Sequence, residues 1–269
     1  MQVLSWGGPM ELRLLRFLAL KNGLSLNYIS KDERLSILLS QLWDIFENDV
    51  VLKGGTAFNR IYLSKLGVSR FSEDIDLDYL KEDKLNDKIR DIKKRMKDVT
   101  EFNVKGPLLL HRTLRFDCYY ENELGTRDRI MVEFYLTKNP HIERNQMMVK
   151  SPFVETHPTI FSVYSKEDML ARKIIALYNR MEGKDIYDVF YGIRIEYDRK
   201  RLDSAFKVLL PFYTIESNIF FRLLKKLGSS KKRARYIGNT TNHFIPKKLR
   251  FNWEETIATL QHDIEKNFL

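Results

Sequence analysis

The sequence has 269 residues, of which 43% are hydrophobic and 30% are charged, so it can form one large or two modest domains with a buried core. Cys118 is the only cysteine, which excludes an intrachain disulfide and a metal site built from thiolates. No apolar run is long enough to cross a bilayer, and segment 11–20 is interrupted by charge, which is typical of an amphipathic helix rather than a signal peptide. From these features we expect a cytoplasmic protein that does not contact membranes, and its formal net charge is +10.

Two helical patterns fill the first 49 residues. In each pattern apolar side chains recur three and four positions apart, which is the spacing of one buried helix face. The first pattern contains Leu12, Leu15, Phe17 and Leu18, and the second contains Leu35, Leu38, Leu39, Leu42 and Ile45. We therefore expect two helices before the first strand.

The short segment Val50–Lys53 is apolar and ends at a double glycine, which predicts a buried strand. Gly54 and Gly55 allow backbone angles, and a close approach of a ligand, that other residues do not. We expect Thr56 to cap a helix beginning near Ala57, whose N-terminus would favour an anion such as phosphate. The inner face of that helix is expected to hold Ala57, Ile61 and Leu66. Taken alone, a double glycine before threonine more often marks an ordinary turn.

Segment 71–79 alternates apolar and acidic residues, as a strand does. Ile75 and Leu77 would face the core. The opposite face would be formed by Ser72, Asp74, Asp76 and Asp78. Carboxylates on one strand face repel unless a cation holds them, and oxygen ligands suit Mg²⁺. The pattern predicts either a metal site or the polar face of an exposed edge strand.

A third carboxylate, Glu133, lies in the strand-like segment 129–136, on the face opposite the apolar side chains of that segment. If this strand lies beside the aspartate strand, Glu133 could complete a metal site with Asp74 and Asp76. The alternative is a solvated carboxylate that pairs with an arginine or a lysine.

The rest of the chain divides into a mixed part and a helical part. The sequence predicts a charged helix over 85–99, a single strand over 108–120, and a loop-rich passage that includes the prolines between 140 and 158. After Ser165 the pattern becomes helical. It predicts a bundle interrupted near 228–238 by a loop rich in glycine, serine and lysine.

The excess positive charge is concentrated near the C-terminus. Segment 217–253 holds ten Lys or Arg residues and no Asp or Glu, which equals the whole net charge of +10. Its cations are interspersed with aromatic residues, an arrangement that suits binding of a phosphate backbone and stacking on bases. The candidate nucleic-acid-binding residues are Lys231, Lys232, Arg233, Arg235, Lys247, Lys248 and Arg250. A solvated basic segment or a surface for an acidic partner is the alternative.

Four sequence blocks, in order, resemble the AbiEii-like toxins, a family of abortive-infection and toxin–antitoxin nucleotidyltransferases within the DNA-polymerase-β-like superfamily. The blocks are Leu-Lys-Gly-Gly-Thr-Ala (52–57), Arg-Phe-Ser-Glu-Asp-Ile-Asp-Leu (70–77), Asp-Met-Leu-Ala-Arg-Lys-Ile-Ile-Ala-Leu (168–177) and Gly-Lys-Asp-Ile-Tyr-Asp-Val (183–189). They span roughly half of the chain. Their combination is far more specific than any single block.

The resemblance implies roles for the matched positions. Asp74 and Asp76 would be the metal-binding pair, and Lys173 would neutralise the triphosphate of the nucleotide. One of Asp185 and Asp188 would be needed for activity. The nucleotide-binding positions would be Gly54, Gly55, Thr56, Ser72 and Lys173.

The same positions also have structural interpretations. Ser165 and Asp168 have the spacing of a capping box that opens a helix, and Lys173 could lay its stem over the apolar stripe of that helix. Asp185 and Asp188 have the spacing of an N-cap and an N3 residue. With the resemblance, we favour function for Lys173 and for at least one of the two aspartates.

These features predict an α+β fold with a nucleotidyltransferase domain over residues 1–162, in which helices flank a mixed sheet, and a helical-bundle domain over residues 163–269. The resemblance implies transfer of a nucleoside monophosphate from an NTP to an acceptor hydroxyl, with Mg²⁺ or Mn²⁺ as cofactor. It also implies the 3′ end of a tRNA as acceptor and a cognate antitoxin as partner. The alternatives are transfer to a protein hydroxyl, and an RNA-binding protein that keeps the fold without catalysis.

Overall fold

The computed structural model describes residues 10–269, and a seven-stranded mixed sheet forms its centre. The strand order is β3–β4–β5–β2–β1–β7–β6, and neighbours are antiparallel except for the parallel pairs β2–β5 and β1–β7. The strands are β1 (Val50–Lys53), β2 (Ile75–Tyr79), β3 (Asn103–Leu110), β4 (Thr113–Glu121), β5 (Arg127–Tyr135), β6 (Arg144–Val149) and β7 (Thr159–Tyr164). The predicted α+β class, with a mixed sheet flanked by helices, is confirmed.

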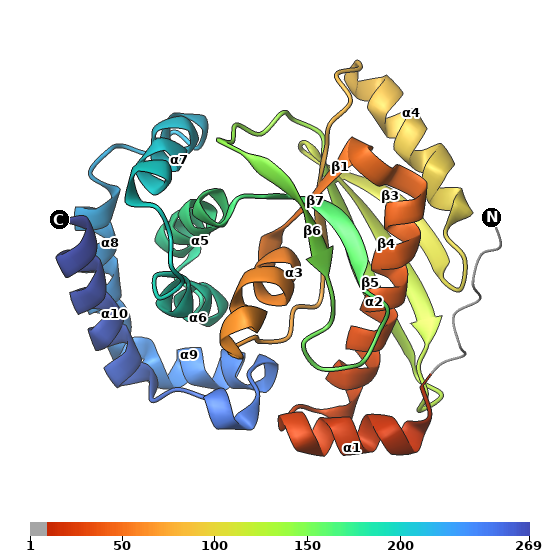
Figure 1. Ribbon diagram of the computed structural model, residues 1–269, viewed down its shortest axis with the longest axis horizontal. Helices are drawn as coiled ribbons and strands as arrows, with labels where there is room; N and C mark the ends of the chain where they lie inside the picture. Colours follow the sequence, from red (N-terminus) through yellow and green to blue (C-terminus); the bar gives the residue numbers. More distant parts are fainter. Residues whose placement is uncertain (1–9) are drawn as a thin grey trace.

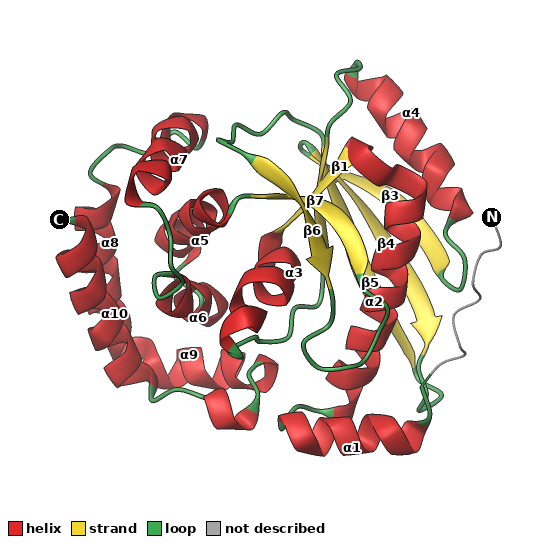
Figure 2. Cartoon of the chain, in the orientation of Figure 1, coloured by secondary structure: helices red, strands yellow, loops and turns green. Residues whose placement is uncertain are grey.

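Helices lie over the sheet and beside it. In Figures 1 and 2, α2 crosses the sheet, and α3 lies between the sheet and the group formed by α5 to α10. The helices are α1 (Leu12–Asn22), α2 (Leu26–Phe46), α3 (Gly54–Ala57), α4 (Leu85–Arg95), α5 (Lys166–Arg180), α6 (Gly183–Gly192), α7 (Arg199–Phe212), α8 (Ile219–Ser230), α9 (Ala234–Thr241) and α10 (Trp253–Phe268). Short turns of helix add η1 (Glu47–Asp49), the π-helical η2 (Phe58–Tyr62), η3 (Leu63–Leu66), η4 (Met96–Asp98), η5 (Lys231–Arg233), η6 (Asn242–Phe244) and η7 (Lys247–Leu249). The two predicted N-terminal helices are confirmed as α1 and α2.

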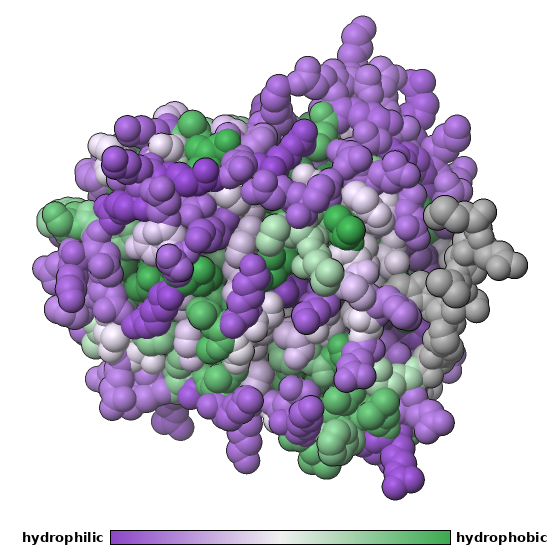
Figure 3. Space-filling view, in the orientation of Figure 1, coloured by the Kyte–Doolittle hydropathy of each residue, from purple (hydrophilic) through white to green (hydrophobic). Residues whose placement is uncertain are grey.

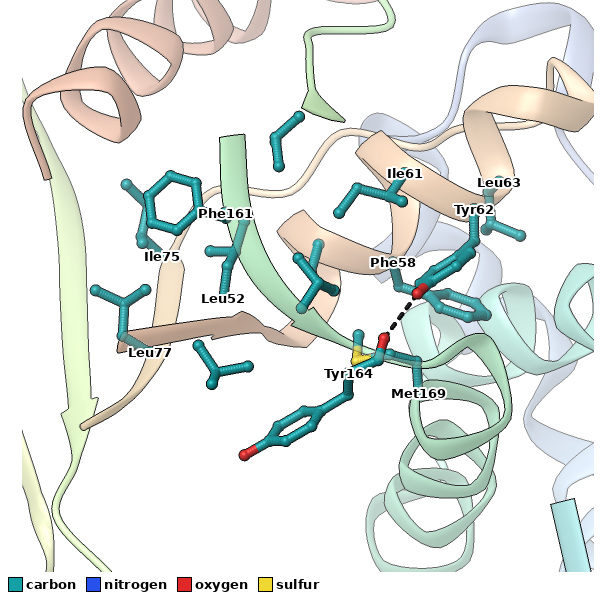
Figure 4. Packing of buried hydrophobic residues seen from close by; sticks show 14 of the residues in the cluster. Leu52, Phe58, Ile61, Tyr62, Leu63, Ile75, Leu77, Phe161, Tyr164 and Met169 are labelled. Atoms are coloured by element: carbon teal, nitrogen blue, oxygen red, sulfur yellow. Dashed lines mark hydrogen bonds between the residues drawn. The ribbon is translucent and has the colours of Figure 1, made fainter. Parts of the chain in front are cut away.

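Alternation along the central strands gives the sheet a buried face and a polar face. Ile75 and Leu77 of β2 are fully buried, as predicted, and they pack with Leu52 of β1 and Phe161 of β7 (Figure 4). In β5 the buried side chains likewise alternate with half-buried ones, and the latter include Glu133. Polar side chains of β2 and β5 therefore share one face of the sheet.

The prediction of one strand over 108–120 is wrong. Residues in this region form two strands, β3 and β4, which pair in an antiparallel hairpin. The hairpin turns at His111 and Arg112, and His111 has a positive φ of 52°. The turn is hard to predict because neither residue belongs to the glycine, asparagine and aspartate types that usually occupy such angles. The sequence also gave no indication of β6, which lies within the proline-rich passage.

The helical part begins after β7. Ser165 is the N-cap of α5 and accepts a hydrogen bond from the backbone N–H of Asp168, as the capping pattern predicts. The expected domain boundary at 162/163 falls inside β7, and buried residues on both sides of it belong to one continuous apolar cluster. The Tyr62 hydroxyl, for example, donates to the backbone carbonyl of Tyr164 at 2.7 Å (Figure 4).

The predicted loop near 228–238 is wrong. This segment is helical throughout, from the end of α8 through η5 into α9. Ser230 and Ile237 are buried against neighbouring helices, and the Ser230 hydroxyl donates to the Leu227 carbonyl. Packing of this kind favours helix over the loop that the local composition indicates.

Apolar side chains also reach the surface. Figure 3 shows a hydrophobic area over α1 at the lower edge of the face in view. The exposed apolar side chains of α1 are Leu14, Phe17 and Leu20. Leu66, which we expected on an inner helix face, is 46% exposed because its helix ends in the 3₁₀ turn η3. Within residues 10–269, no helix is both long enough and apolar enough to span a bilayer.

Candidate active site

A cavity of about 420 Å³ lies where the β1–α3 junction, the segment before β2 and the helices α5 and α6 meet. Its walls carry charged side chains of both signs. The cations are Lys53, Arg70, Arg172, Lys173, Arg180 and Lys184, and the carboxylates are Glu73, Asp74, Asp76, Glu182 and Asp185. The cavity therefore brings together two parts of the sequence, up to Asp76 and from Met169 onward, that lie more than 90 residues apart.

The double glycine brings the backbone close to two predicted site residues. Gly54 has a φ of +73°, and a Cβ atom at this position would lie 1.9 Å from Oδ2 of Asp76. A Cβ atom on Gly55 would lie 2.7 Å from the hydroxyl of Ser72. Both glycines and Ser72 line the cavity, so the double glycine serves close approach as well as turn geometry.

The prediction that Thr56 caps a helix is wrong. The N-cap position of α3 is Lys53, which makes no capping hydrogen bond through its side chain. Thr56 is fully buried, and its hydroxyl donates to the backbone carbonyl of Asp74 at 2.5 Å. Thr56 is not among the cavity-lining residues. Its side chain instead fixes the backbone from which Asp74 projects.

A row of four charged residues crosses the polar face of the sheet. In the strand register Lys53 of β1 lies opposite Asp76 of β2, Asp76 lies beside Glu133 of β5, and Glu133 lies opposite Arg115 of β4. Arg115 binds Glu133, with its Nη2 2.7 Å from Oε1. The order along the row is therefore cation, carboxylate, carboxylate, cation.

Glu133 lies beside Asp76, as predicted, but its carboxylate is paired with a cation and is not open to the cavity. Arg115 holds the Glu133 carboxylate, which does not line the cavity. Within residues 10–269, no group of three or more His, Cys, Asp or Glu side chains is arranged to hold a metal ion. The alternative interpretation, a strand carboxylate paired with an arginine, describes Glu133 as it stands.

Asp78 does not face the cavity with the other two aspartates. It is buried, and its Oδ1 lies 2.5 Å from the ammonium of Lys53 and 2.6 Å from Nδ2 of Asn139. The Tyr164 hydroxyl donates to Oδ2 at 2.5 Å. These three donors satisfy the carboxylate, so the third aspartate of the alternating pattern holds Lys53 in position instead of binding a ligand.

Asp74 and Asp76 are half-buried carboxylates that face the cavity. Burial, followed by repulsion from Asp76 and Glu73, raises the pKa of Asp74 to about 6. Burial also raises the pKa of Asp76, although Lys53 acts in the opposite direction. No hydrogen bond to either carboxylate is found among the described side chains. Two desolvated oxygen donors whose ionisation costs free energy fit a hard divalent cation such as Mg²⁺.

Lys173 faces the cavity from α5 as part of a buried ionic cluster. Its ammonium lies 2.8 Å from Oδ2 of Asp188. Arg70 binds the same carboxylate in a bidentate manner, with Nε–Oδ1 2.8 Å and Nη2–Oδ2 2.7 Å, and Asn59 donates to it at 3.2 Å. Burial opposes ionisation of Asp188, but Arg70 and Lys173 outweigh it and lower its pKa. Asp188 thus fixes two cations at the cavity wall.

The capping interpretation of Asp185 and Asp188 is wrong, because α6 begins at Gly183 and its N-cap is Glu182. Asp185 lines the cavity and binds Arg180, with Oδ1 2.5 Å from Nη2 and Oδ2 3.1 Å from Nε. Asp188 has no exposed surface and acts through the cations that it holds. Both aspartates therefore orient arginine or lysine side chains at the cavity.

The seven basic residues predicted to bind nucleic acid lie outside this cavity. They form two groups separated by the length of α9. Lys231, Lys232, Arg233 and Arg235 lie on η5 and the start of α9, and Lys247, Lys248 and Arg250 lie on or beside η7. None of the seven forms an ion pair with a residue of the described chain.

Of the six cavity cations, sequence reasoning assigned a role only to Lys173, and it gave none to Lys53, Arg70, Arg172, Arg180 or Lys184. Lys53 and Arg70 each adjoin a motif residue, Gly54 and Phe71, inside the blocks that carry the resemblance. A cation beside each motif is the only signal that could have identified them. Arg180 has no such signal, because its position depends on how α5 and α6 pack together.

Comparisons with known proteins show the family and the fold of this chain. The sequence model of the family described as nucleotidyl transferase AbiEii toxin, type IV toxin–antitoxin system, matches residues 37–266. The match confirms the resemblance seen in the four blocks and extends it through the C-terminal helices. Among curated proteins, no sequence match was found.

Two solved structures share the fold. JHP933 from Helicobacter pylori superposes with a TM-score of 0.55 at 16% identity, covering 90% of this chain and 92% of that chain. MenT4, a nucleotidyltransferase toxin from Mycobacterium tuberculosis, superposes with a TM-score of 0.58 at 16% identity, covering 95% of this chain and 90% of that chain. At this level of identity the likeness concerns the fold alone.

Proposed function

The chain belongs to the AbiEii family of nucleotidyl transferase toxins of type IV toxin–antitoxin systems, and we propose that it transfers a nucleoside monophosphate from an NTP to an RNA hydroxyl. The observation that carries this proposal is the asymmetry of the cavity. Asp74 and Asp76 face it without cationic partners, while Arg70, Lys173 and Arg180 are held around it by buried aspartates. A metal-bound triphosphate matches both halves, because its oxygens need cations and its metal needs carboxylates.

Each side chain then has a defined task. Asp74 and Asp76 would hold the divalent cation, Mg²⁺ or Mn²⁺, which supplies Lewis-acid stabilisation of phosphoryl oxygens when it is bound. Gly54 and Gly55 let phosphate oxygens approach the backbone closely. Lys173 and Arg180 would offset the negative charge of the triphosphate and of the leaving pyrophosphate.

In the transfer itself, the acceptor oxygen forms a bond to the α-phosphorus and loses its proton. The bond between the α-phosphorus and the bridging oxygen breaks, and pyrophosphate leaves. The cavity residues contribute mainly position and charge, which is where most catalysis of phosphoryl transfer arises.

The acceptor that we favour is the 3′ end of a tRNA. Support comes from the basic groups around Lys231–Arg235 and Lys247–Arg250, which carry unpaired positive charge on the surface. Such charge suits a polyanion, because binding of phosphates releases counterions. A cognate antitoxin is the partner that family membership leads us to expect, and the cytoplasm is the compartment in which all three would meet.

The experiment incubates the protein with each of the four labelled NTPs, Mg²⁺, and either total tRNA or protein lysate. We expect label in tRNA and release of pyrophosphate, both lost in the Asp76→Asn variant. Label in a protein band would overturn the RNA acceptor and favour a protein-modifying transferase. RNA binding without any pyrophosphate release would show a catalytically silent RNA-binding protein.

A further inference from the structure

A second cavity, of about 490 Å³, lies between four segments that are distant in the sequence. Its walls come from Asn22 at the end of α1, residues 64–69 after η2, residues 150–153 between β6 and β7, and residues 246–249 around η7. It shares no lining residue with the active-site cavity. Both the sheet part and the helical part of the chain contribute to it, so it exists only when the two parts are packed together.

The charges that line this second cavity are all positive. Three exposed lysines, Lys65, Lys150 and Lys248, contribute to its walls, and no carboxylate does. None of the three ammonium groups forms an ion pair or a hydrogen bond with a residue of the described chain. The active-site cavity differs in this respect, because five carboxylates line it together with its cations.

The neutral polar side chains of the walls are already committed within the protein. Ser64 donates to the Arg60 carbonyl and Ser69 to the Asn59 carbonyl. Nδ2 of Asn22 donates to the carbonyls of Leu18 and Phe153. The Ser151 hydroxyl donates to Asp32 and accepts from two backbone N–H groups. The capacity of the cavity to bind a ligand therefore resides in its ammonium groups. Three ammonium groups, with no planar guanidinium and no side chain that contacts base edges, recognise negative charge rather than a nucleotide sequence.

The two cavities are neighbours along the chain. Ser69 lines the second cavity, and the next residue, Arg70, lines the active-site cavity together with Ser72. Three residues of extended chain span at most about 11 Å, so the Cα atoms of Ser69 and Ser72 can be no farther apart than that. The walls of the two cavities therefore approach each other closely at this segment.

We propose that the cavity of Lys65, Lys150 and Lys248 binds the phosphate backbone of the acceptor RNA close to its reacting end. This inference rests on the proposed function and adds to it the place where the acceptor is held. Lys248 belongs to the basic group around η7, and Lys65 and Lys150 line the same cavity. A single inorganic phosphate would leave much of the three-lysine charge unbalanced, whereas an RNA backbone offers one charge per nucleotide.

The test compares two triple variants of the full chain that lose the same charge. The site variant carries Lys65→Ser, Lys150→Ser and Lys248→Ser. The control variant carries Lys84→Ser, Lys94→Ser and Lys207→Ser, three exposed lysines that form no ion pair and line neither cavity. Binding of a labelled tRNA and of a single-stranded RNA is measured by anisotropy over a range of salt concentrations, with unfolding curves to establish that both variants fold.

We expect the site variant to bind RNA about tenfold or more weakly, with a salt dependence reduced by about two units in log–log slope, because each phosphate contact to a single strand contributes about 0.7. The control variant should change both quantities much less. An equal loss in the two variants would overturn the proposal, since only net charge would then matter. Unchanged RNA affinity in the site variant would also overturn the proposal. This holds even if the site variant no longer captures an acidic protein partner.

The outcomes for the cavity and for the proposed function are separable. RNA affinity is measured without NTP, so a loss confined to the site variant supports the cavity even if no transfer is detected. In another outcome, the wild type transfers nucleotide while the site variant has the same RNA affinity and the same KM for RNA as the wild type. That result would support the proposed function and overturn the proposed role of the cavity.

Discussion

Two groups of charged side chains at the same cavity differ in how their charges are balanced. Asp188 is enclosed by Arg70, Lys173 and Asn59, and its pKa is lowered. Asp74 and Asp76 face the cavity together, and burial raises the pKa of both, with repulsion from Asp76 adding to the shift of Asp74. The Asp188 cluster is complete within the folded chain, whereas the Asp74–Asp76 pair becomes balanced only when a cation binds.

This difference distinguishes a residue that holds other side chains in position from residues that would bind a ligand. A buried carboxylate with two cations leaves one net positive charge, and that charge is presented to the cavity by Lys173 and Arg70. A carboxylate pair without a partner costs stability in the free protein and is retained where a ligand offsets the cost. Under the proposed function, the comparison predicts triphosphate binding at one wall of the cavity and metal binding at the other.

The largest effect is expected from Asp76→Asn, which keeps the shape of the side chain and removes its charge. Transfer should fall by about 10³-fold or more, equivalent to about 4 kcal/mol, because the metal-binding pair is broken. Pyrophosphate release measures the rate, and circular dichroism monitors folding.

Glu133→Gln should retain activity within about tenfold, since Arg115 holds that carboxylate. Equal losses in the two variants would place Glu133 with the binding pair.

The Asp188 cluster should instead dominate stability. Asp188→Ala leaves Arg70 and Lys173 buried without a counter-charge and should lower the free energy of unfolding by about 3–5 kcal/mol. Lys173→Met leaves the bidentate Arg70–Asp188 pair intact, so it should cost about 1 kcal/mol while transfer still falls. Urea unfolding at pH 7 measures both. A Lys173→Met variant as unstable as Asp188→Ala would contradict this division.

The stabilisation from Asp188 also has a defined pH dependence. The pKa of Asp188 is lower in the folded chain than in the unfolded chain. Its contribution is therefore complete above the unfolded pKa, near 4, and is lost as the pH falls through the lower folded pKa. Unfolding curves of the wild type and Asp188→Ala should converge at acid pH and differ most at neutral pH.

A smaller effect is expected from Gly54→Ala. The new Cβ would lie 1.9 Å from Oδ2 of Asp76 at a φ of +73°, so Asp76 must move. We expect a loss of about 1–3 kcal/mol together with a loss of transfer activity. Gly125→Ala is the matched control, because its φ is +70° and its nearest contact would be 3.8 Å away. If both variants retained full activity, Gly54 would not be needed for the position of Asp76.

The smallest effect is a gain in stability. The pKa of Asp74 is raised to about 6 in the folded chain, so the free energy of unfolding should fall as the pH rises from about 4 to about 6 and stay level above that. Asp74→Asn removes this loss and should be more stable than the wild type by about 1–2 kcal/mol at pH 7.5, after allowance for solvent. The two proteins should be equally stable at pH 4. Urea unfolding without divalent cations measures the difference, and equal stability at both pH values would contradict the raised pKa.

Local pattern was sufficient for much of the fold and for part of the site. Val50–Lys53, Ile75 and Leu77, and the start of α5 at Ser165 follow from periodicity and capping, and the structure has each as predicted. The β3–β4 turn and the helix across 228–238 were missed because their local residue types favour other structures. There the turn angles and the helix are imposed by strand pairing and by packing against neighbouring helices.

By itself, the sequence determined which residues carry the charges: the alternating aspartates, the double glycine, Lys173 and the last aspartate motif. Only the tertiary structure decided their partners. Asp78 is satisfied by Lys53 and Tyr164, Glu133 by Arg115, and Asp188 by cations from two distant segments. The physical reason is that a charge interacts through distance and burial, and both are set by strand register and helix packing, not by neighbours in the chain.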